Sequence, residues 1–537
     1  MLKGHQYNAY EYLNFILKKP STSTRKFVLP GFTNEINIYI DLPSKELPNK
    51  YKDSMDRPNI LLIITDHVAW HQHQTDPNFE LKLPVWEKFC REGIEFNNAY
   101  TVSPICTPAR ASILTGLYPS RHGLRWNTEA MLPRNLADFK KGQKLYSCYL
   151  KEAGYNNSYI GKWHCGSKLT AADFGLNGWS VPHYGQPYKT DKYREYIRNK
   201  GLNSPTGTIE HRLRHDFTGQ GSIEEYMDAA GVMDGPMEGH HDHFISSLAI
   251  DELNSLTQSN QPWSLTASYW GPHHAYFPTK DFAGKVNPLS IAVYPSFNED
   301  LSNKPFRYKL HTNIHRAKEQ WPEWSTWQKV IARAYEQQIQ TDHAVGQLLE
   351  ALDKSDQKDN TLVIWLADHG DGIGAHGGSW DKACSFTEEI TRIPMAIRWP
   401  EKITPDQCFK LTSNIDATPT ILAAAGITMP DEVDGLNLLR LTAKNCTWPD
   451  SRIFEHHGHG LELLQRVLVK NKFKYCAALF DGDELYDLKS DPYELNNLIH
   501  SPEHKELCRE MREEIIKHLE FTNDYVSKPL KHWLLNQ

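Results

Sequence analysis

One cysteine lies in a stretch whose residue types could make it more reactive than an ordinary thiol. The stretch is SPICTPARASILTG at residues 103–116, in which Cys106 stands two residues before Pro108 and four before Arg110. We expect Thr107 to cap a helix whose first residue is Pro108. The positive end of that helix and Arg110 would stabilise an anion or a thiolate at residue 106. The alternative for a lone cysteine is a small buried hydrophobic residue.

Two apolar runs of the chain both end in aspartate. NILLIIT (59–65) is followed by Asp66, and TLVIWLA (361–367) is followed by Asp368 and His369. Because ligands bind beyond the carboxyl ends of parallel strands, these side chains predict a divalent-metal site. Oxygen ligands suit calcium or magnesium, and the imidazole nitrogen also admits manganese. The alternative is that each aspartate caps the helix that follows.

The elements needed to position these residues follow an α/β pattern. Buried strands are expected at 59–65 and 361–367, and a helix with apolar spacings of three and four residues at 330–353. Alternating strands and helices predict a mostly parallel sheet. A short strand is expected at 37–43. Beyond 415–427 the pattern changes to strands within 466–480 and 483–488 and a terminal helix at roughly 502–520, which predicts a small α+β subdomain.

Composition excludes several classes of function. The 537 residues are 39% hydrophobic and 23% charged with a net charge of −7, so no nucleic-acid partner is expected and an anionic substrate would need a local basic pocket. The first twenty residues lack the apolar core of a signal peptide, and no run is long enough to span a membrane. We therefore expect a cytoplasmic protein with no membrane partner. Nine scattered cysteines without a CxxC pair indicate reduced thiols.

A longer match around Cys106 resembles a known family. CTPARASILTGLYPSRHG (106–123) resembles the signature of the sulfatase family, in which the cysteine of Cys-x-Pro-x-Arg is oxidised to formylglycine. Further stretches follow in the family's order: GKWHCG (161–166), PHHAYFP (272–278), ADHGDGIGAHG (367–377), WDKACSFTEEITRIPMAIRWP (380–400) and LYDLKSDPYELNNL (485–498). The resemblance implies an alkaline-phosphatase-like fold, a mostly parallel sheet sandwiched by helices with a smaller α+β C-terminal subdomain. It also implies sulfatase activity on a sulfate ester.

The resemblance divides the chain into three parts. Residues 1–56 are an N-terminal extension of unknown role, and residues 57–440 are the sulfatase catalytic domain. Residues 441–537 are a C-terminal subdomain that borders the substrate cleft. In that subdomain, the EHHGHG cluster at 455–460 offers three histidines as candidates for substrate contact, with a second metal site as the alternative: His456, His457 and His459.

The resemblance also implies a role for each site residue. The divalent metal, calcium before magnesium or manganese, is assigned to Asp66, Asp368, His369 and Cys106. Arg110 and Lys162 would hold the formylglycine made from Cys106, whose hydrated aldehyde attacks sulfur through one hydroxyl and expels sulfate with the help of the second. His164, two residues from Lys162 in an expected extended segment, would take the proton of the second step. The sulfuryl group and the leaving oxygen would be contacted by His273 and Lys382, with His274 as the alternative to His273.

Two departures from the family pattern keep other functions open. His67 stands where many sulfatases place a second metal-binding aspartate, and it could bind metal, orient a ligand or do neither. Asp368-His369-Gly370 resembles the branch that includes phosphonate monoester hydrolases, phosphodiesterases and choline sulfatases. The favoured function is hydrolysis of a sulfate ester, with a sulfated saccharide as a candidate. The alternatives are a phosphonate monoester or phosphodiester hydrolase and an inactive binding homologue.

The expected partners follow from this chemistry. They are a small anionic ester as substrate and a formylglycine-generating maturation enzyme that acts on Cys106. The sequence leaves a homo-oligomer open.

Overall fold

The structure is a computed structural model that describes most of the chain after the N-terminal extension. The described ranges are 57–68, 81–128, 138–213, 219–223, 227–310, 319–382, 385–443, 445–459 and 462–536. The strand expected at 37–43 lies outside them. Within these ranges, no helix combines the length and the apolar character needed to cross a bilayer.

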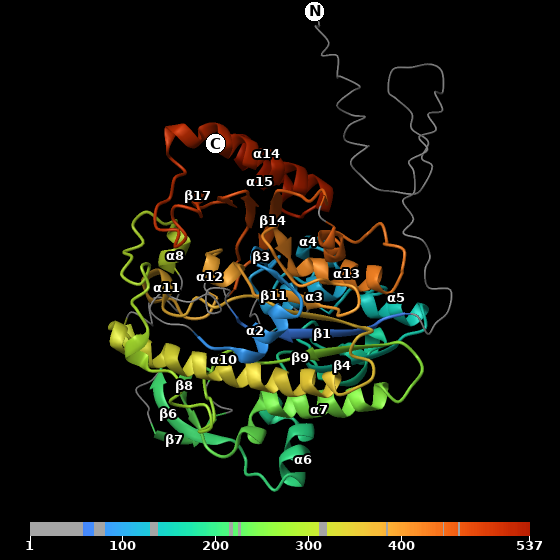
Figure 1. Cartoon of the computed structure of the whole chain (residues 1–537). Coiled ribbons are helices and arrows are strands. Elements are labelled where there is room, and N and C mark those ends of the chain that lie inside the picture. The colour runs from blue at the N-terminus through green and yellow to red at the C-terminus, as the bar shows by residue number, and fades with distance from the viewer. Residues whose placement is uncertain are drawn as a thin grey trace, which may run out of the picture.

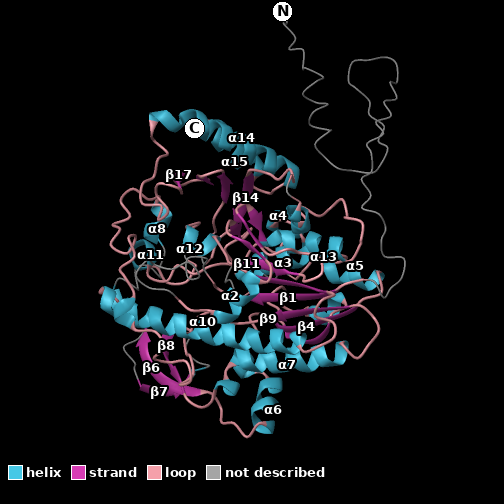
Figure 2. Ribbon diagram, in the orientation of Figure 1, coloured by secondary structure: helices cyan, strands magenta, loops and turns pink. Residues whose placement is uncertain are grey.

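An eight-stranded sheet forms the centre of the molecule (Figure 2). Its strands, from one edge to the other, are β12 (Asp406–Cys408), β2 (Ile94–Phe96), β11 (Met395–Arg398), β10 (Thr361–Ala367), β1 (Asn59–Thr65), β9 (Trp263–Ser268), β4 (Asn156–Lys162) and β5 (Asn177–Val181). Neighbouring strands from β10 to β5 are all parallel, and β11 runs antiparallel to both of its neighbours. The strands predicted at 59–65 and 361–367 are β1 and β10, residue for residue.

Helices cover both faces of this sheet (Figure 1). One layer holds α2 (Pro84–Arg91), α7 (His241–Leu256) and α10 (Trp324–Asp353), and the other holds α3 (Cys106–Thr115), α5 (Tyr146–Glu152) and α13 (Ala417–Ala424). Because side chains alternate along a strand, Leu61 and Ile63 of β1 pack with the first layer, whereas Ile60, Leu62 and Ile64 pack with the second. Burial on both faces explains why β1 is continuously apolar. The α/β sandwich confirms the predicted fold class.

A four-stranded antiparallel sheet with two helices completes the C-terminal part. The strands are β14 (Ser451–His456), β15 (Gln465–Lys470), β16 (Phe473–Ala478) and β17 (Glu484–Asp487), and the helices are α14 (Lys505–Thr522) and α15 (Ser527–Leu535). Leu468 and Tyr475 face the helices, whereas Val467 and Val469 pack with Tyr100 of β3 (Ala99–Tyr100). The predicted terminal helix corresponds to α14, and α15 was not predicted.

A third, smaller sheet lies beyond α10 (Figure 1). It orders β7 (Gly219–Ser222), β6 (Thr206–Arg212) and β8 (Ala229–Met233). Bridges from Ala230 to Tyr276 and from Met233 to Thr279 attach β8 to the segment that follows β9. This sheet therefore anchors the loop that carries His273. Short elements elsewhere include β3 (Ala99–Tyr100), β13 (Thr412–Ser413), α4 (Pro119–His122), α6 (Asp191–Asn199), α8 (Phe306–Leu310), α11 (Ala375–Gly378) and α12 (Glu388–Thr391).

Candidate active site

The ends of β1 and β10 bring two carboxylates together. Thr65 pairs with Ala367, so Asp66 and Asp368 leave the sheet side by side. One donor atom each from Asp66, Cys106, Asp368 and His369 lies within 4.8 Å of the others, and all four side chains are buried. The Asp368 carboxylate accepts the backbone N–H of His369 at 2.8 Å, and neither aspartate caps a described helix. The four residues expected at a metal are therefore neighbours in the fold.

His369 presents one defined ring nitrogen to this group. Its Nδ1 donates to the carbonyl oxygen of Gly370 at 2.8 Å, so Nε2 carries the lone pair, and Nε2 lies 3.0 Å from Cys106 Sγ. Burial lowers the pKa of His369 and keeps the ring neutral. A neutral imidazole with its second nitrogen held by a carbonyl is the usual form of a histidine metal ligand. The donor set therefore fits a divalent cation.

Cys106 lies inside a helix rather than in front of one. Helix α3 begins at Cys106, its N-cap is Ile105, and no side chain caps it. The Thr107 hydroxyl donates instead to the carbonyl oxygen of His164 at 2.7 Å. The predicted Thr107 cap is therefore wrong, because that hydroxyl ties the first turn of α3 to the loop after β4. Residue 106 still lies at the positive end of the helix.

Arg110 joins the strand ends from one turn further along α3. Its Nε donates to Asp368 at 2.9 Å, and its Nη2 lies 3.4 Å from the Asp66 carboxylate. Nη1 donates to Ser268 Oγ at 2.6 Å and to the Lys162 carbonyl at 3.2 Å. Burial alone would lower the pKa of Arg110, but the two carboxylates raise it, so the guanidinium stays charged.

Lys162, the last residue of β4, forms an ion pair with Asp66. Burial alone would raise the pKa of Asp66, but Lys162 and Arg110 hold that pKa well below its ordinary value. The Lys162 Nζ also lies 4.2 Å from the centre of the Tyr184 ring. Tyr184 is therefore part of the wall around this cation, and nothing in the sequence had singled it out.

Lys382 enters the site from the loop after α11 with Asp381 as its partner. Nζ donates to the Asp381 carboxylate at 2.7 Å, and both residues are buried. Burial alone would lower the pKa of Lys382, but Asp381, with Cys106 nearby, raises it. Asp381 also lies 3.2 Å from His67 Nε2. Asp381 was not predicted as a site residue, although its place directly before Lys382 could have indicated a partner for that lysine.

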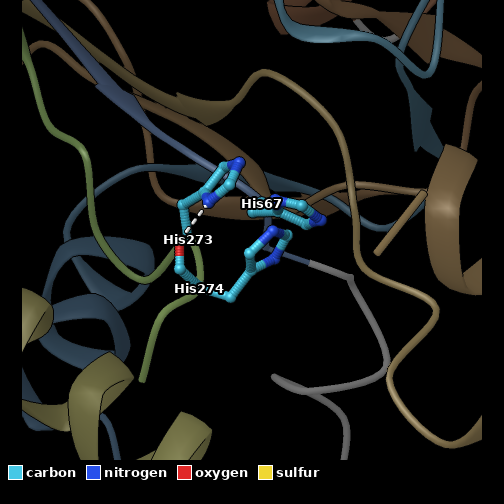
Figure 3. Close-up of side chains that lie close together, drawn as sticks. All are labelled: His67, His273 and His274. Atoms are coloured by element: carbon cyan, nitrogen blue, oxygen red, sulfur yellow. Dashed lines mark hydrogen bonds between the residues drawn. The ribbon is translucent and has the colours of Figure 1, made fainter. Parts of the chain in front are cut away.

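Three imidazoles meet beside this pair (Figure 3). The His67 ring lies 4.3 Å from that of His273 and 5.1 Å from that of His274, measured between ring centres. His273 Nδ1 donates to the His274 carbonyl at 2.5 Å. Burial lowers the pKa of all three rings, to about 3 for His274, and Lys382 contributes each time. Their nitrogens could accept a transition ion, but the nearby ammonium of Lys382 disfavours a second cation there.

His164 lies beyond the end of β4 in a tight backbone conformation. The strand ends at Lys162, and His164 has a φ of 52°, so the expected extended segment is wrong at this residue. The left-handed turn places its ring 5.5 Å from that of Tyr184, edge to face. His164 and Lys162 thus reach the same tyrosine by a turn and not by strand alternation.

The histidines of the 455–460 cluster have different surroundings: two are buried in the C-terminal part, and one approaches the site. His456 and His457 are fully buried, and His457 Nε2 lies 3.2 Å from Glu455. His459 is the one whose ring reaches the site, with Nδ1 3.7 Å from the Asp381 carboxylate. The C-terminal part of the chain therefore borders the site through His459.

Comparison with known proteins shows which families and relatives this chain is similar to. A family model described as Sulfatase matches residues 58–427, and one described as N-sulphoglucosamine sulphohydrolase, C-terminal, matches residues 374–520. An uncharacterized sulfatase of Escherichia coli (strain K12), YidJ, is 28% identical over 478 residues, which are 88% of each chain.

Solved structures share the fold at low identity. A structure in complex with its substrate D-glucosamine-2-N,6-O-disulfate has a TM-score of 0.69 and 20% identity, and the match covers 88% of this chain and 99% of that one. The phosphonate monoester hydrolase of Silicibacter pomeroyi also has a TM-score of 0.69, with 19% identity and coverage of 88% and 97%. At these identities the two neighbours show the fold alone.

Proposed function

This chain belongs to the sulfatase family and is a sulfuric ester hydrolase, and we propose that its substrate is the sulfate ester of a saccharide. In this proposal residue 106 attacks the sulfur of that ester. The observation that carries the proposal is the buried group of Asp66, Cys106, Asp368 and His369 within 4.8 Å. The sulfated glucosamine bound by one structural neighbour supports the choice of a saccharide.

The family generally uses a divalent metal and a formylglycine, and the residues of this chain suit both. Asp66, Asp368, His369 and residue 106 would hold the cation. We propose calcium, because the two carboxylates and the oxygen of a formylglycine at residue 106 would make three of the four donors oxygens. When present, the cation and the aldehyde made from Cys106 would supply the nucleophile and neutralise the sulfuryl charge. A maturation enzyme must supply that aldehyde.

On one side of residue 106, two cations would orient it. Arg110 is fixed by four contacts and cannot swing away, so it would hold residue 106 against the metal-binding carboxylates. Lys162, paired with Asp66, would polarise the same residue. His164, tied to the first turn of α3 through Thr107, would accept the proton released there.

On the other side, Lys382 and His273 would meet the sulfuryl group and the leaving oxygen. Asp381 holds the Lys382 ammonium in place, so the positive charge is positioned before the substrate arrives. The hydrogen bond from His273 Nδ1 to the His274 carbonyl leaves Nε2 as the atom that can meet the leaving oxygen.

A phosphonate monoester or phosphodiester hydrolase is the second candidate. His369 at the metal group and the phosphonate monoester hydrolase among the structural neighbours favour it. The same cationic walls would suit a phosphonate oxyanion, so the charges described here do not separate the two esters.

The test compares one aryl sulfate with the matching aryl phosphonate monoester. The enzyme preparation is first shown by peptide mass analysis to carry formylglycine at residue 106, and a Cys106→Ala protein serves as the control. We expect kcat/KM to be higher for the sulfate and turnover to be lost in the control. A higher value for the phosphonate would move the chain to the second candidate, and equal turnover by the control would exclude residue 106 as the nucleophile.

A further inference from the structure

We propose that His67 is a positioning residue that holds Lys382 in place through Asp381, and that its ring is not a ligand of the catalytic cation. This role rests on the proposed function, in which the Lys382 ammonium meets the sulfuryl group. The sequence left the part played by His67 open, because many members of the family have a second metal-binding aspartate at this position. The surroundings of the His67 backbone and of its ring decide between the alternatives.

The backbone of His67 is fixed where two central strands end. Its N–H donates to the Asp368 carboxylate at 3.1 Å, and the N–H of the next residue, Val68, donates to the His369 carbonyl at 2.8 Å. Residue 67 has a φ of 66°, in the left-handed region. The hydrogen bond from His67 to the metal-binding group therefore comes from its backbone, and the ring is left for other contacts.

The His67 ring faces two carboxylates that are not in the metal-binding group. Nε2 lies 3.2 Å from the Oδ1 of Asp381 and 3.6 Å from the Oδ1 of Asp371. An unprotonated Nε2 would place its lone pair against those of both oxygens, so the neutral ring is more stable with its proton on Nε2. His67 therefore acts as an N–H donor toward Asp381 and Asp371.

The same two carboxylates have a second partner each. Asp381 Oδ1 accepts the Lys382 ammonium at 2.7 Å, and the hydroxyl of Tyr276 donates to Asp371. A continuous series of polar contacts thus runs from Tyr276 through His67 to Lys382, and all five side chains are buried. Because a fully connected buried series is rigid, loss of the His67 donor should let Asp381 shift and should displace the Lys382 ammonium with it.

An aspartate at residue 67 would suit these surroundings poorly. It would add a third carboxylate beside Asp371 and Asp381, and like charges that close together destabilise one another unless a cation lies between them. The imidazole of His67 adds a neutral donor instead. Among the residues that the structure describes, the four with donor atoms within 4.8 Å of one another at the cation site do not include His67.

A metal ion held by three imidazoles is the alternative. Donor atoms of His67, His273 and His274 lie within 4.8 Å of one another (Figure 3). However, His273 Nδ1 already donates to the His274 carbonyl, and His67 Nε2 faces the carboxylate that binds the Lys382 ammonium. A further cation here would meet that ammonium, so the donor role of His67 fits the charges better.

Glutamine and asparagine at residue 67 separate the donor from the backbone conformation. The amide nitrogen of glutamine reaches roughly the place of Nε2, whereas that of asparagine stops near the place of Nδ1. In enzyme that carries formylglycine at residue 106, we expect His67→Asn to lower kcat/KM for 4-nitrophenyl sulfate by about tenfold or more, and His67→Gln by about threefold at most. A purely conformational role predicts the opposite order, because asparagine tolerates a φ of 66° better than glutamine does. Equal losses in the two variants, that opposite order, or no loss in either would overturn the inference.

The route through Asp381 is tested with a second substitution. We expect Asp381→Asn alone to lower kcat/KM by about tenfold or more, and His67→Asn to add less than about threefold in that background, because the two changes break the same connection to Lys382. Losses that multiply would show that His67 acts without Asp381, which contradicts the inference. His500→Asn and His500→Gln are the matched controls with no expected effect, since His500 is exposed before α14.

Cation content and binding distinguish this inference from the proposed function. Metal content by mass spectrometry should be the same in His67→Asn as in the unchanged protein, and loss of any bound metal ion would make His67 a ligand and overturn the inference. Isothermal titration of 4-nitrophenyl sulfate into Cys106→Ala proteins, with calcium present, measures the hold on the sulfuryl group without turnover. We expect the Kd to rise by about tenfold with His67→Asn and by about threefold at most with His67→Gln. This order would support the role of His67 even if the formylglycine enzyme never hydrolysed the ester, a result that would count against the proposed function alone. An equal Kd in both variants would contradict the role of His67.

Discussion

The ion pair of Arg110 and Asp368 connects the other residues of the site, because each partner also contacts further site residues. Asp368 is one of the four buried residues that we propose as cation ligands, and it also accepts the Nε–H of Arg110 at 2.9 Å. Arg110 in turn reaches Asp66 and the end of β4. A change at either residue should therefore affect cation binding and the orientation of residue 106 together.

We expect Asp368→Asn to lose the bound cation and to lower kcat/KM by about 10²–10³-fold or more, because a neutral amide is a weaker cation ligand and no longer balances Arg110. Metal content by mass spectrometry of the purified protein and kcat/KM for an aryl sulfate measure the two effects. Asp353→Asn is the control, since Asp353 pairs with Arg398 away from the site. Unchanged cation content in Asp368→Asn would remove Asp368 from the ligand set.

At the residue scale, a site residue could be predicted from the sequence when it belongs to a recognisable local pattern. Asp66 and Asp368 could be predicted because each follows a continuous apolar strand, and parallel strands end at one edge. Tyr184 could not, since it lies on a loop whose place beside Lys162 depends on packing between distant segments. The left-handed conformation of His164 also has no signal in its residue type.

At the element scale, α3 is a helix without an exposed face. All ten of its residues, including Cys106, are buried. The maturation enzyme that we propose would have to reach the Cys106 side chain, which is buried in the folded protein. We therefore expect conversion to precede the packing of α3 between the sheet and α13.

We expect a maturation enzyme to convert Cys106 in a peptide of residues 103–116 or in the urea-unfolded chain. It should convert the folded protein at least tenfold more slowly, because only the small fraction of molecules in which α3 is locally unfolded exposes Cys106. Peptide mass analysis after timed incubation measures formylglycine at residue 106. Equal rates for the folded protein and the peptide would show that α3 opens readily.

Glu455 joins elements that are far apart in the sequence. From β14 it accepts the backbone N–H and the hydroxyl of Ser120 in α4 at 2.8 and 2.7 Å. It also contacts His457 at 3.2 Å and His518 of α14 at 2.9 Å. This buried carboxylate therefore connects the C-terminal sheet with the segment that follows the Cys106 motif.

We expect Glu455→Gln to lower the free energy of unfolding by about 2–4 kcal/mol. The two carboxylate oxygens of Glu455 now accept several buried hydrogen bonds, and the amide N–H₂ of glutamine is itself a donor and cannot replace one of those oxygens. Thermal and urea unfolding followed by circular dichroism measure the change. Glu513→Gln is the control, since Glu513 is exposed on α14 and pairs only with Arg509 in the described structure; its expected effect is within about 0.5 kcal/mol. Equal stability of the two variants would mean that Glu455 does not connect the two parts energetically.

At the scale of the whole molecule, the layered architecture followed from sequence because each layer leaves a periodic pattern. The helix predicted at 330–353 lies within α10, whose buried residues recur at helical spacing against the sheet. The start of α3 and the existence of α15 were not predicted. The prediction placed Thr107 at a cap because its contact with the loop after β4 is tertiary and leaves no local signal. Helix α15 has only nine residues, so it depends on packing against α14 rather than on its own propensity.

A buried histidine links three distant segments of the molecule. His376 Nδ1 lies 2.8 Å from Glu299, and its Nε2 lies 3.4 Å from Glu389. Lys304, 3.8 Å from Glu299, donates to Tyr486 of the C-terminal sheet at 2.9 Å. Burial alone would lower the pKa of His376, but Glu389 and Glu299 raise it to about 9. The histidine is therefore a cation in the folded protein at neutral pH.

This charge predicts that stability decreases on the alkaline side. The pKa of His376 is about 9 when folded and about 6.5 when unfolded, so its protonation stabilises the fold fully below pH 6.5 and progressively less as the pH rises through 9, by about 3 kcal/mol in all. Urea unfolding from pH 6 to 9.5 should show this decrease in the free energy of unfolding. His376→Asn, which keeps a residue that tolerates the φ of 43°, should flatten it. His532→Asn, at an exposed position of α15, should not. An identical alkaline decrease in all three proteins would mean that His376 is not the group that titrates, and that the three segments are joined by packing alone.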